Sequence, residues 1–338
     1  MDFTQFNHKN ILLIGYGKEG QSTERYLRKH APDAKITVTD QKNGEEYLKN
    51  QEAFDIRIKS AGIPKNLIAK PYTTATNIFF SAVKGLTIGV TGTKGKSTTS
   101  SLIYSILKNA GKRVHLVGNI GTPWFDDVDP VDSEDHIFVC ELSSYQLDDI
   151  EYSPDISVFV SFFPEHMNYH GSVDKYWEAK SRIIKKATKD NYFVYNPDVE
   201  ELRKLAQESP AKSVPYVSTP DIPAVEISLI GEHNQQNIKA ARTVAGILNI
   251  NDTIVLDSIR SFLPLPHRLQ NVGTHHGVTF FDDAISTTPE STMCAIKSLG
   301  NISVILLGGM DRGYDFTGLV RLLNEKNIRH IVLFPDSG

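Results

Sequence analysis

The sequence predicts an α/β protein with parallel sheets, and three observations lead to this class. Short apolar runs alternate with longer amphipathic stretches along the chain, which is the pattern of parallel strands connected by helices. Two glycine-rich turns, at residues 15–20 and 91–98, each lie between an apolar run and a helical stretch. The 338 residues are enough for two or three domains. We therefore expect three Rossmann-like or P-loop domains with parallel sheets, the C-terminal one incomplete.

The first domain is expected over residues 1–84, because its apolar and amphipathic stretches follow the order of a βαβ unit. An apolar run leads into the first glycine turn, and a helical stretch follows that turn. The predicted elements are the strands Ile11–Ile14, Ile36–Thr39 and Asp55–Ile58 and the helix Gln21–His30.

The second domain is expected over residues 85–266. A new apolar run, Leu86–Val90, begins just after Lys84 and enters the second glycine turn, which starts a new βα series. The further predicted elements are the strands His136–Cys140, Ile156–Phe162 and Tyr192–Tyr195 and the helices Thr98–Asn109 and Asn234–Leu248.

The third domain is expected over residues 267–338. Its predicted strands are Thr279–Phe281, Val304–Leu307 and His330–Phe334. This stretch is shorter than the roughly 100–150 residues of a complete domain of this kind, which is why we expect it to be incomplete.

Composition and charge exclude several classes of protein. The formal net charge of −4 gives no bulk attraction to nucleic acid or to an anionic membrane. Two cysteines, Cys140 and Cys294, are too few for a disulfide framework or a zinc cluster, and their apolar surroundings predict that both are buried. The N-terminus lacks a secretory signal pattern, and no apolar run approaches the ~18 residues of a spanning helix. We therefore expect a cytoplasmic protein that binds neither nucleic acid nor membrane.

The first glycine turn has the pattern G-x-G-x-x-G, formed by Gly15, Gly17 and Gly20. Glycines allow a tight turn and a close backbone approach to a phosphate, and the helix that follows offers its free N–H groups. Asp40 ends the next predicted strand and supplies an acceptor for a ribose or base edge. Binding of a nucleotide or dinucleotide is indicated, and the alternative is a glycine turn with only a structural purpose.

The second glycine turn predicts a loop that binds the phosphates of ATP. Lys96 can neutralise the β- and γ-phosphates, and the hydroxyl of Ser97 is placed to coordinate Mg²⁺. Val90 stands where the strict P-loop pattern has glycine, so this is a variant loop whose alternative is a solvated basic turn. The residues expected to contact ATP here are Gly92, Thr93, Lys94, Gly95, Lys96, Ser97 and Thr98.

Further motifs along the chain resemble the Mur ligase family in both sequence and order. They span nearly the whole chain: Thr91–Thr98, Gly118–Pro123, Glu141–Leu147, Glu165-His166, Tyr176–Lys180, Gly231–Asn237, Pro266–Arg268 and Leu307–Gly309. The glycine turn, Asp40 and Ser60–Pro64 make the first domain similar to that of the glutamate-adding members.

The resemblance implies a ligase of peptidoglycan precursor synthesis. ATP would phosphorylate the carboxylate of UDP-N-acetylmuramoyl-L-alanine, and glutamate would attack the acyl phosphate to form the amide. D-glutamate is favoured, and L-glutamate or another amino acid stays open. A monomer is the family's expectation. If Gly338 is the true C-terminus, we expect nucleotide binding without efficient ligation.

The resemblance also implies a metal and catalytic centre in the second domain. Ser97, Glu141, His166 and Lys180 would bind Mg²⁺, with Lys180 carbamylated to become a carboxylate-like ligand. Lys96, His166 and Lys180 would be the catalytic residues. From the residues alone, Glu141 could be a solvated loop acid, His166 a structural histidine and Lys180 an exposed helix lysine.

Substrate contacts are implied in all three domains. His233, Asn234 and Asn237 of the second domain and Arg268 and Asp283 of the third would also contact ATP. The remaining substrate-binding candidates are Gly15, Gly17, Lys18, Glu19, Gly20, Asp40, Ser60, Gly62, Asn119, Ser143, Gln146, Thr287 and Arg312. Three positions depart from the family pattern: Ser161 stands for asparagine, Asn168 for aspartate and Ile285 for lysine. Arg312 can still grip a carboxylate in a bidentate fork.

Two functions of other classes compete with the ligase. An NAD-dependent oxidoreductase is supported by the first glycine turn and Asp40, but the second phosphate loop argues against it. A non-catalytic protein that only binds nucleotide is supported by the short third domain. Changes in intrinsic fluorescence on adding NAD(H) or ATP separate the first rival from the ligase.

Overall fold

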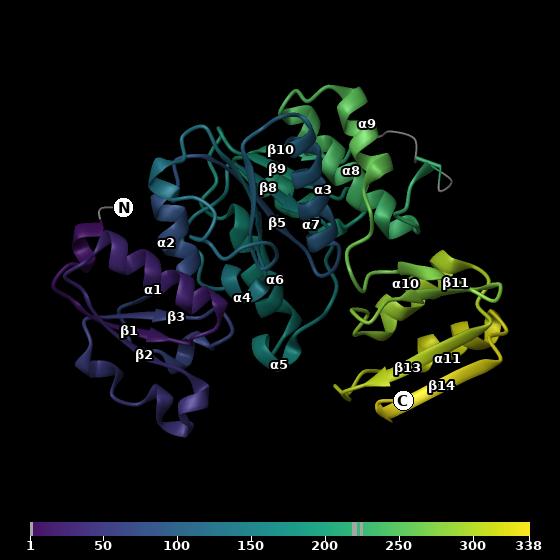
Figure 1. Cartoon of the computed structure of the whole chain (residues 1–338), viewed down its shortest axis with the longest axis horizontal. Helices are drawn as coiled ribbons and strands as arrows, with labels where there is room; N and C mark the ends of the chain where they lie inside the picture. Colours follow the sequence, from purple (N-terminus) through teal and green to yellow (C-terminus); the bar gives the residue numbers. More distant parts are fainter. Residues whose placement is uncertain (1–2, 218–221, 224–225) are drawn as a thin grey trace. The chain divides into compact units, whose positions relative to one another are not determined.

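The computed structural model describes residues 3–217, 222–223 and 226–338. The chain divides into two compact units, the first formed by Met1–Ser218 with Lys239–Val255 and the second by Thr219–Ile238 with Leu256–Gly338. The first unit holds two parallel sheets, and the second holds two pairs of strands (Figure 1). No helix in the described part of the chain is long and apolar enough to cross a bilayer.

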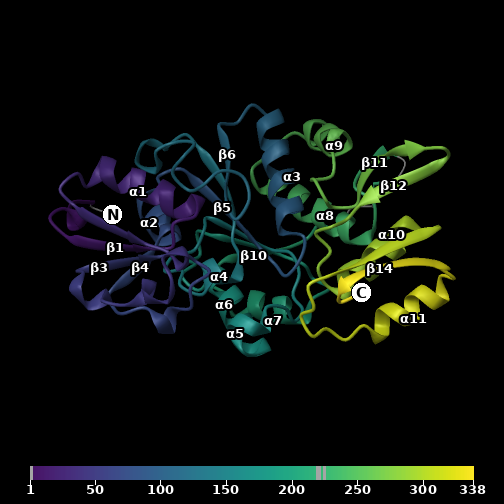
Figure 2. The ribbon, with the colours of Figure 1, turned by 60° about the horizontal axis from the view of Figure 1, so that its bottom comes forward.

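The N-terminal sheet has four parallel strands in the order β2-β1-β3-β4. Ile11 and Leu13 of β1 pack on one face against Tyr26 and Ile78, and Leu12 and Ile14 are buried on the other face. Figures 1 and 2 both show α1 along one face of this sheet. The elements are β1 (Asn10–Ile14), α1 (Lys18–His30), β2 (Lys35–Thr39), β3 (Ile56–Lys59), β4 (Tyr72–Thr74) and α2 (Ala75–Ala82).

The central sheet has six parallel strands in the order β10-β9-β8-β5-β7-β6. The first strand in sequence, β5, lies between β7 and β8, so the carboxyl ends of these three strands are neighbours. Ligands of open α/β sheets bind outside such strand ends, where the strand order reverses. The strands are β5 (Leu86–Thr91), β6 (Val114–Gly118), β7 (Ile137–Glu141), β8 (Ile156–Phe159), β9 (Tyr192–Tyr195) and β10 (Lys212–Pro215).

Helices alternate with the strands of the central sheet along the chain, and others follow its last strand. Phe79, Trp124, Phe138, Phe159 and Phe193 are fully buried and belong to one apolar cluster. The helices are α3 (Lys96–Asn109), α4 (Ser144–Leu147), α5 (Met167–His170), α6 (Val173–Ser181), α7 (Glu200–Glu208), α8 (Glu232–Ile247) and α9 (Asp252–Ser261).

The second unit differs in part from the expected parallel sheet. The predicted strand near Thr279–Phe281 is present, but it pairs antiparallel with a strand that sequence analysis missed. His276 and Gly277 turn this hairpin with positive φ angles of 50° and 78°, as two-residue hairpin turns require. Among the described strands of this unit, the last two are the ones that pair in parallel. The elements are β11 (Gln270–His275), β12 (Val278–Asp282), α10 (Pro289–Leu299), β13 (Val304–Gly309), α11 (Thr317–Glu325) and β14 (His330–Asp336).

A buried ion pair joins the N-terminal sheet to the segment after α4. Lys59 Nζ, at the end of β3, lies 2.5 Å from Asp149 Oδ2, and both side chains are almost completely buried. Tyr72 donates a hydrogen bond to Asp149 Oδ1 at 2.9 Å, and Asn77 donates to the Asp149 carbonyl at 2.8 Å. Asp149 thus contacts donor groups from β3, β4 and α2. These contacts connect the N-terminal sheet to the central one.

Replacing Asp149 with alanine is expected to destabilise the first unit by about 3–5 kcal/mol, because it leaves the buried ammonium of Lys59 without its ion-pair partner. The lowering of its thermal unfolding transition measures the effect. Asp148→Ala is the matched control, since Asp148 pairs with the half-exposed Lys65 and should cost at most about 1 kcal/mol. Equal shifts in the two variants would contradict the assigned role of the buried pair.

Candidate active site

The second glycine turn forms a phosphate loop between β5 and α3. Gly92 and Gly95 have φ angles of 155° and 86°, which residues with a side chain rarely adopt. Lys96 begins α3, and its Nζ donates to the carbonyl oxygens of Gly92 and Thr93 at 3.0 Å each. Val90 is a fully buried residue of β5, so its departure from the strict pattern falls in the strand and leaves the loop intact.

Hydroxyl groups hold the loop in shape. Thr93 Oγ1 donates to the Phe163 carbonyl at 3.0 Å and accepts from Tyr176 Oη at 3.2 Å. Ser161 Oγ donates to the Lys94 carbonyl at 2.8 Å and accepts from the Lys94 N–H at 3.0 Å. Ser161, which departs from the family pattern, therefore serves here to fix the loop backbone.

Glu141 ends β7 and carries a buried carboxylate. Its Oε1 accepts a hydrogen bond from Asn119 Nδ2 at 2.7 Å. Its Oε2 is shielded from solvent and has no hydrogen-bond partner in the described part of the chain. A buried carboxylate oxygen without a partner is costly, and a hard cation is the ligand that satisfies it. Within that part, no group of three or more His, Cys, Asp and Glu side chains could hold a metal by itself. A cation therefore needs other donors, such as a hydroxyl or phosphate oxygens.

Lys180 is not an exposed helix lysine. Its side chain is 1% exposed, and Nζ donates to the Gly92 carbonyl at 2.7 Å. It also lies 5.0 Å from the centre of the Tyr176 ring. Burial and the nearby Lys96 ammonium hold the pKa of Lys180 well below its usual range. Lys180 is thus a buried amine of reduced basicity beside the phosphate loop.

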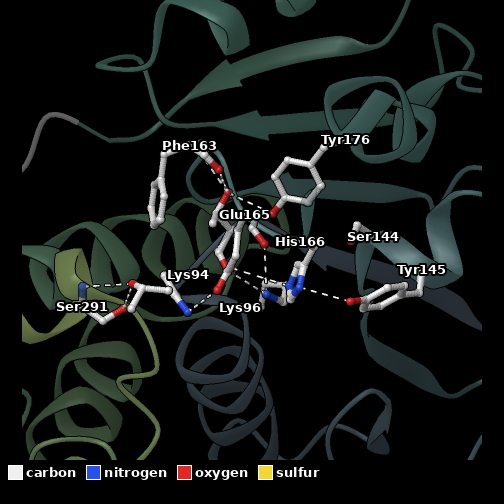
Figure 3. A network of polar contacts seen from close by, with 12 residues as sticks. Lys94, Lys96, Ser144, Tyr145, Phe163, Glu165, His166, Tyr176 and Ser291 are labelled. Atoms are coloured by element: carbon white, nitrogen blue, oxygen red, sulfur yellow. Dashed lines mark hydrogen bonds and ion pairs between the residues drawn. The ribbon is translucent and has the colours of Figure 1, made fainter. Parts of the chain in front are cut away.

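A chain of polar contacts leads from the phosphate loop to His166 (Figure 3). Lys94 Nζ pairs with Glu165 Oε1 at 2.7 Å, and Glu165 Oε2 lies 3.7 Å from His166 Nε2. His166 Nδ1 lies 3.1 Å from Tyr145 Oη. Burial lowers the pKa of His166; the Glu165 carboxylate opposes this shift, and the Lys180 and Lys96 ammonium groups add to it.

The first glycine turn is tightly packed against neighbouring atoms of the N-terminal sheet and of the turn itself. A Cβ on Gly15 would lie 2.3 Å from Ser60 Oγ, and one on Gly20 would lie 2.2 Å from the Gly15 carbonyl oxygen. Asp40 Oδ2 accepts the Tyr16 N–H at 2.6 Å, and Oδ1 accepts the Lys42 N–H at 3.0 Å. These two backbone donors lower the pKa of Asp40. The Asp40 carboxylate therefore stabilises the turn, and a ribose hydroxyl would have to bind the same carboxylate oxygens.

Several other substrate candidates have a local structural partner. Glu19 accepts from Trp124 Nε1 at 3.1 Å, which ties α1 to the central part of the first unit. Ser143 and Gln146 form a capping box at the start of α4. Gly17 and Lys18 are exposed, and Ser60 and Gly62 lie in the loop that follows β3. Their contacts with substrate stay predictions.

The remaining candidates lie in the second unit. Asn237 Nδ2 donates to Asn234 Oδ1 at 2.9 Å, and Asn234 Nδ2 donates to the Ile230 carbonyl at 2.8 Å. Asp283 accepts from the Leu269 N–H at 3.0 Å and from Ser286 Oγ. Burial raises the pKa of Asp283. The other candidates of this unit are His233, Arg268, Thr287 and Arg312.

Sequence analysis missed two tyrosines of the site. Tyr145 lies inside the motif Glu141–Leu147, and Tyr176 begins the motif Tyr176–Lys180. Their positions within these motifs were the available signal. What they contact depends on the packing of α4, α5 and α6, which no local pattern encodes.

The fold and the site together define a class of protein. A phosphate loop after the central strand, with a buried acid on the next strand and cationic side chains around the loop, is an arrangement for chemistry at an activated phosphate. Residues 90–221 match the Mur ligase middle domain.

The sequence comparisons place the chain within that class. It is 33% identical over 381 residues to the UDP-N-acetylmuramoylalanine–D-glutamate ligase of Geobacillus sp. (strain WCH70), an alignment that covers 98% of this chain and 83% of the relative. It is 30% identical to the ligase of the same name from Streptococcus agalactiae serotype III (strain NEM316), with coverage of 99% and 84%. The chain belongs to the Mur ligase family of ATP-dependent carbon–nitrogen ligases, as its motifs predict.

Solved structures show the same fold at low sequence identity. The MurC ligase of Thermotoga maritima matches with a TM-score of 0.63 at 16% identity, covering 97% of this chain and 90% of that one. The MurF ligase of Thermotoga maritima, determined in complex with ADP, matches with a TM-score of 0.62 at 16% identity and coverage of 98% and 82%. The predicted α/β fold class is thereby confirmed.

Proposed function

We propose that this chain adds D-glutamate to UDP-N-acetylmuramoyl-L-alanine at the expense of ATP, a step of peptidoglycan precursor synthesis. The observation that carries the proposal is the phosphate loop with Lys96, placed beside the buried carboxylate of Glu141 and the buried amine of Lys180. Support for the substrates comes from relatives that bear the name of this ligase and align over nearly the whole chain.

Each predicted domain takes one substrate in this proposal. Residues 1–84 hold the UDP moiety at the first glycine turn, residues 85–266 hold ATP, and residues 267–338 hold the amino acid. ATP suits the central domain because its loop has Lys96 and Ser97 at the start of a helix, which the first turn lacks. The domain limits, a monomeric state and a cytoplasmic location stay predictions.

The residues around the loop neutralise and orient charge. Loop N–H groups and Lys96 bind the ATP phosphates. To do so, the Lys96 ammonium leaves the two loop carbonyl oxygens that it now contacts and donates to phosphate oxygens instead. The acceptor carboxylate then attacks the γ-phosphorus and displaces ADP, giving an acyl phosphate. The glutamate amine attacks its carbonyl carbon, loses a proton, and the tetrahedral intermediate expels phosphate to leave the amide.

The residues present fit Mg²⁺, which would neutralise phosphate charge when bound. Glu141 Oε2, a buried oxygen without a hydrogen-bond partner among the described residues, is one that such a cation would satisfy, and the Ser97 hydroxyl lies in the first turn of α3. His166 and a carbamylated Lys180 are the further proposed ligands. The low pKa of Lys180 supports its part, because a carbamate forms from the uncharged amine.

The amino acid and its stereochemistry are tested by product analysis. The chain is incubated with ATP, Mg²⁺, the UDP-muramoyl-L-alanine substrate and either D- or L-glutamate, and products are identified by mass spectrometry. We expect the amide product with ADP and phosphate from D-glutamate. Product from L-glutamate alone would reassign the amino acid. Binding of both nucleotides without product would favour the nucleotide-binding alternative, and binding of NAD(H) in place of ATP would favour the oxidoreductase.

A further inference from the structure

Tyr145 contacts His166 at Nδ1, the ring nitrogen on the side away from Glu165. Its hydroxyl oxygen lies 3.1 Å from Nδ1, whereas Glu165 Oε2 lies 3.7 Å from Nε2. The first distance is within hydrogen-bond range and the second is beyond it. Figure 3 shows Tyr145 and Glu165 on opposite sides of the imidazole. A neutral imidazole carries one proton, and the partner of one nitrogen decides the state of the other.

The ring of Tyr145 is held on several sides. It packs edge-on against Tyr169 with ring centres 4.5 Å apart, and it stacks on His170 at 5.9 Å. His170 is itself held by a hydrogen bond of 3.0 Å to Ser144 Oγ, the residue before Tyr145. The capping box of Ser143 and Gln146 fixes the start of the short helix that carries Tyr145. The Tyr145 hydroxyl is thus held in position to contact His166.

The backbone at His166 has an unusual conformation. His166 has a φ angle of 60°, a left-handed conformation that residues with a side chain seldom adopt. It stands just before α5 and has no side-chain cap bond to that helix. The imidazole lies against the rings of Tyr145 and Tyr176 and contacts the Tyr145 hydroxyl at Nδ1.

We propose that Tyr145 is a positioning residue for His166: the Tyr145 hydroxyl oxygen accepts a hydrogen bond from Nδ1–H, which leaves the imidazole lone pair on Nε2, on the side of Glu165 and its partner Lys94 in the phosphate loop. The inference rests on the proposed function only for what Nε2 then contacts, a cation held with the ATP phosphates. Groups that orient a ligating histidine in this way typically change metal affinity or activity by about 10–100-fold when they are removed.

The test replaces Tyr145 with phenylalanine, which keeps the ring and removes only the hydroxyl. Nitrogen-15 NMR of histidine-labelled full-length protein, at about pH 8 where an ordinary imidazole is neutral, reports which nitrogen carries the proton. His166→Gln assigns the signal. We expect the Nδ1–H form in the wild type and a shift toward the Nε2–H form in Tyr145→Phe. Binding of Mg²⁺ in the presence of a non-hydrolysable ATP analogue should weaken by about 10–100-fold.

Tyr169→Phe is the matched control, because the Tyr169 hydroxyl is buried beside the same rings without a hydrogen-bond partner in the described part of the chain. It should leave the His166 signal and Mg²⁺ binding unchanged. An unchanged His166 signal in Tyr145→Phe, or equal losses in both variants, would overturn the proposal and leave Tyr145 a packing residue. The NMR measurement needs no substrate, so it stands even if the wild type forms no product and the proposed function fails.

Discussion

Replacing Lys96 with alanine is expected to abolish ATP binding and to leave binding of the UDP-muramoyl substrate nearly unchanged. Lys96 is the cation at the start of α3, and two loop carbonyls already hold its ammonium inside the loop. Two charge-assisted hydrogen bonds at about 1.5–3 kcal/mol each amount to a loss of at least about 100-fold in affinity. Alanine also keeps the helix start intact, since it favours helix.

Calorimetric titration with each nucleotide ligand measures both affinities. Lys108→Ala is the control, because Lys108 is an exposed lysine in the last turn of the same helix and should bind ATP as the wild type does. A Lys96→Ala protein that loses both ligands equally would show that the ATP site is not confined to the second glycine turn.

Replacing Lys180 with alanine is expected to lower the rate of ATP-dependent phosphate release by about 10²–10³-fold, the size of effect that follows removal of one preorganised electrostatic group. Lys180 is buried against the Gly92 carbonyl, and its low pKa leaves an amine able to take up CO₂. The resulting carbamate would be the carboxylate-like group of the proposed centre. Small carboxylates or bicarbonate in excess should partly restore the rate of the variant.

Carbon-13 NMR with labelled bicarbonate tests the carbamate directly in the wild type. Lys175→Ala is the control, since Lys175 is exposed on the same helix and should keep full activity and the carbamate signal. Full activity of Lys180→Ala would contradict the catalytic role. Loss of activity without a carbamate signal or rescue would reduce Lys180 to a support of the loop backbone.

The sequence was sufficient for the parts of the fold that local patterns encode. Both glycine turns lie at strand–helix junctions as predicted, because glycine content, apolar runs and helix starts are read over a few residues. Strands β4, β6, β10 and β11 were missed. They are short or contain polar residues, as in Val114–Gly118, and they are strands because of the neighbours with which they pair.

The burial and partners of single side chains depend on tertiary packing, which the sequence does not show. The lowered pKa of Lys180 follows from burial, whereas the sequence alone predicted an ordinary exposed helix lysine. Asp149, unremarked in the sequence, is the partner of a buried lysine. Cys294 was predicted to be buried and is exposed, because α10 turns that residue away from its small core.

Residues predicted as substrate ligands proved the hardest to separate from structural ones. Asp40, Glu19 and Ser143 each have a hydrogen-bond partner within the protein that accounts for the residue type. By contrast, Glu141 has one oxygen without such a partner in the described part of the chain. A buried carboxylate oxygen without a partner, as in Glu141, is therefore the stronger sign of a bound cation, and it is visible only in the folded chain.

Transfer of oxygen from the acceptor substrate to phosphate tests the central claim most directly. The carboxylate of UDP-N-acetylmuramoyl-L-alanine is labelled with oxygen-18, and the chain is supplied with ATP, Mg²⁺ and D-glutamate. An acyl phosphate transfers one carboxylate oxygen to the phosphate that leaves, so we predict one labelled oxygen in each phosphate released during amide formation. Phosphate released without label would show that water, and not the acceptor carboxylate, attacks ATP, and it would contradict the ligase account.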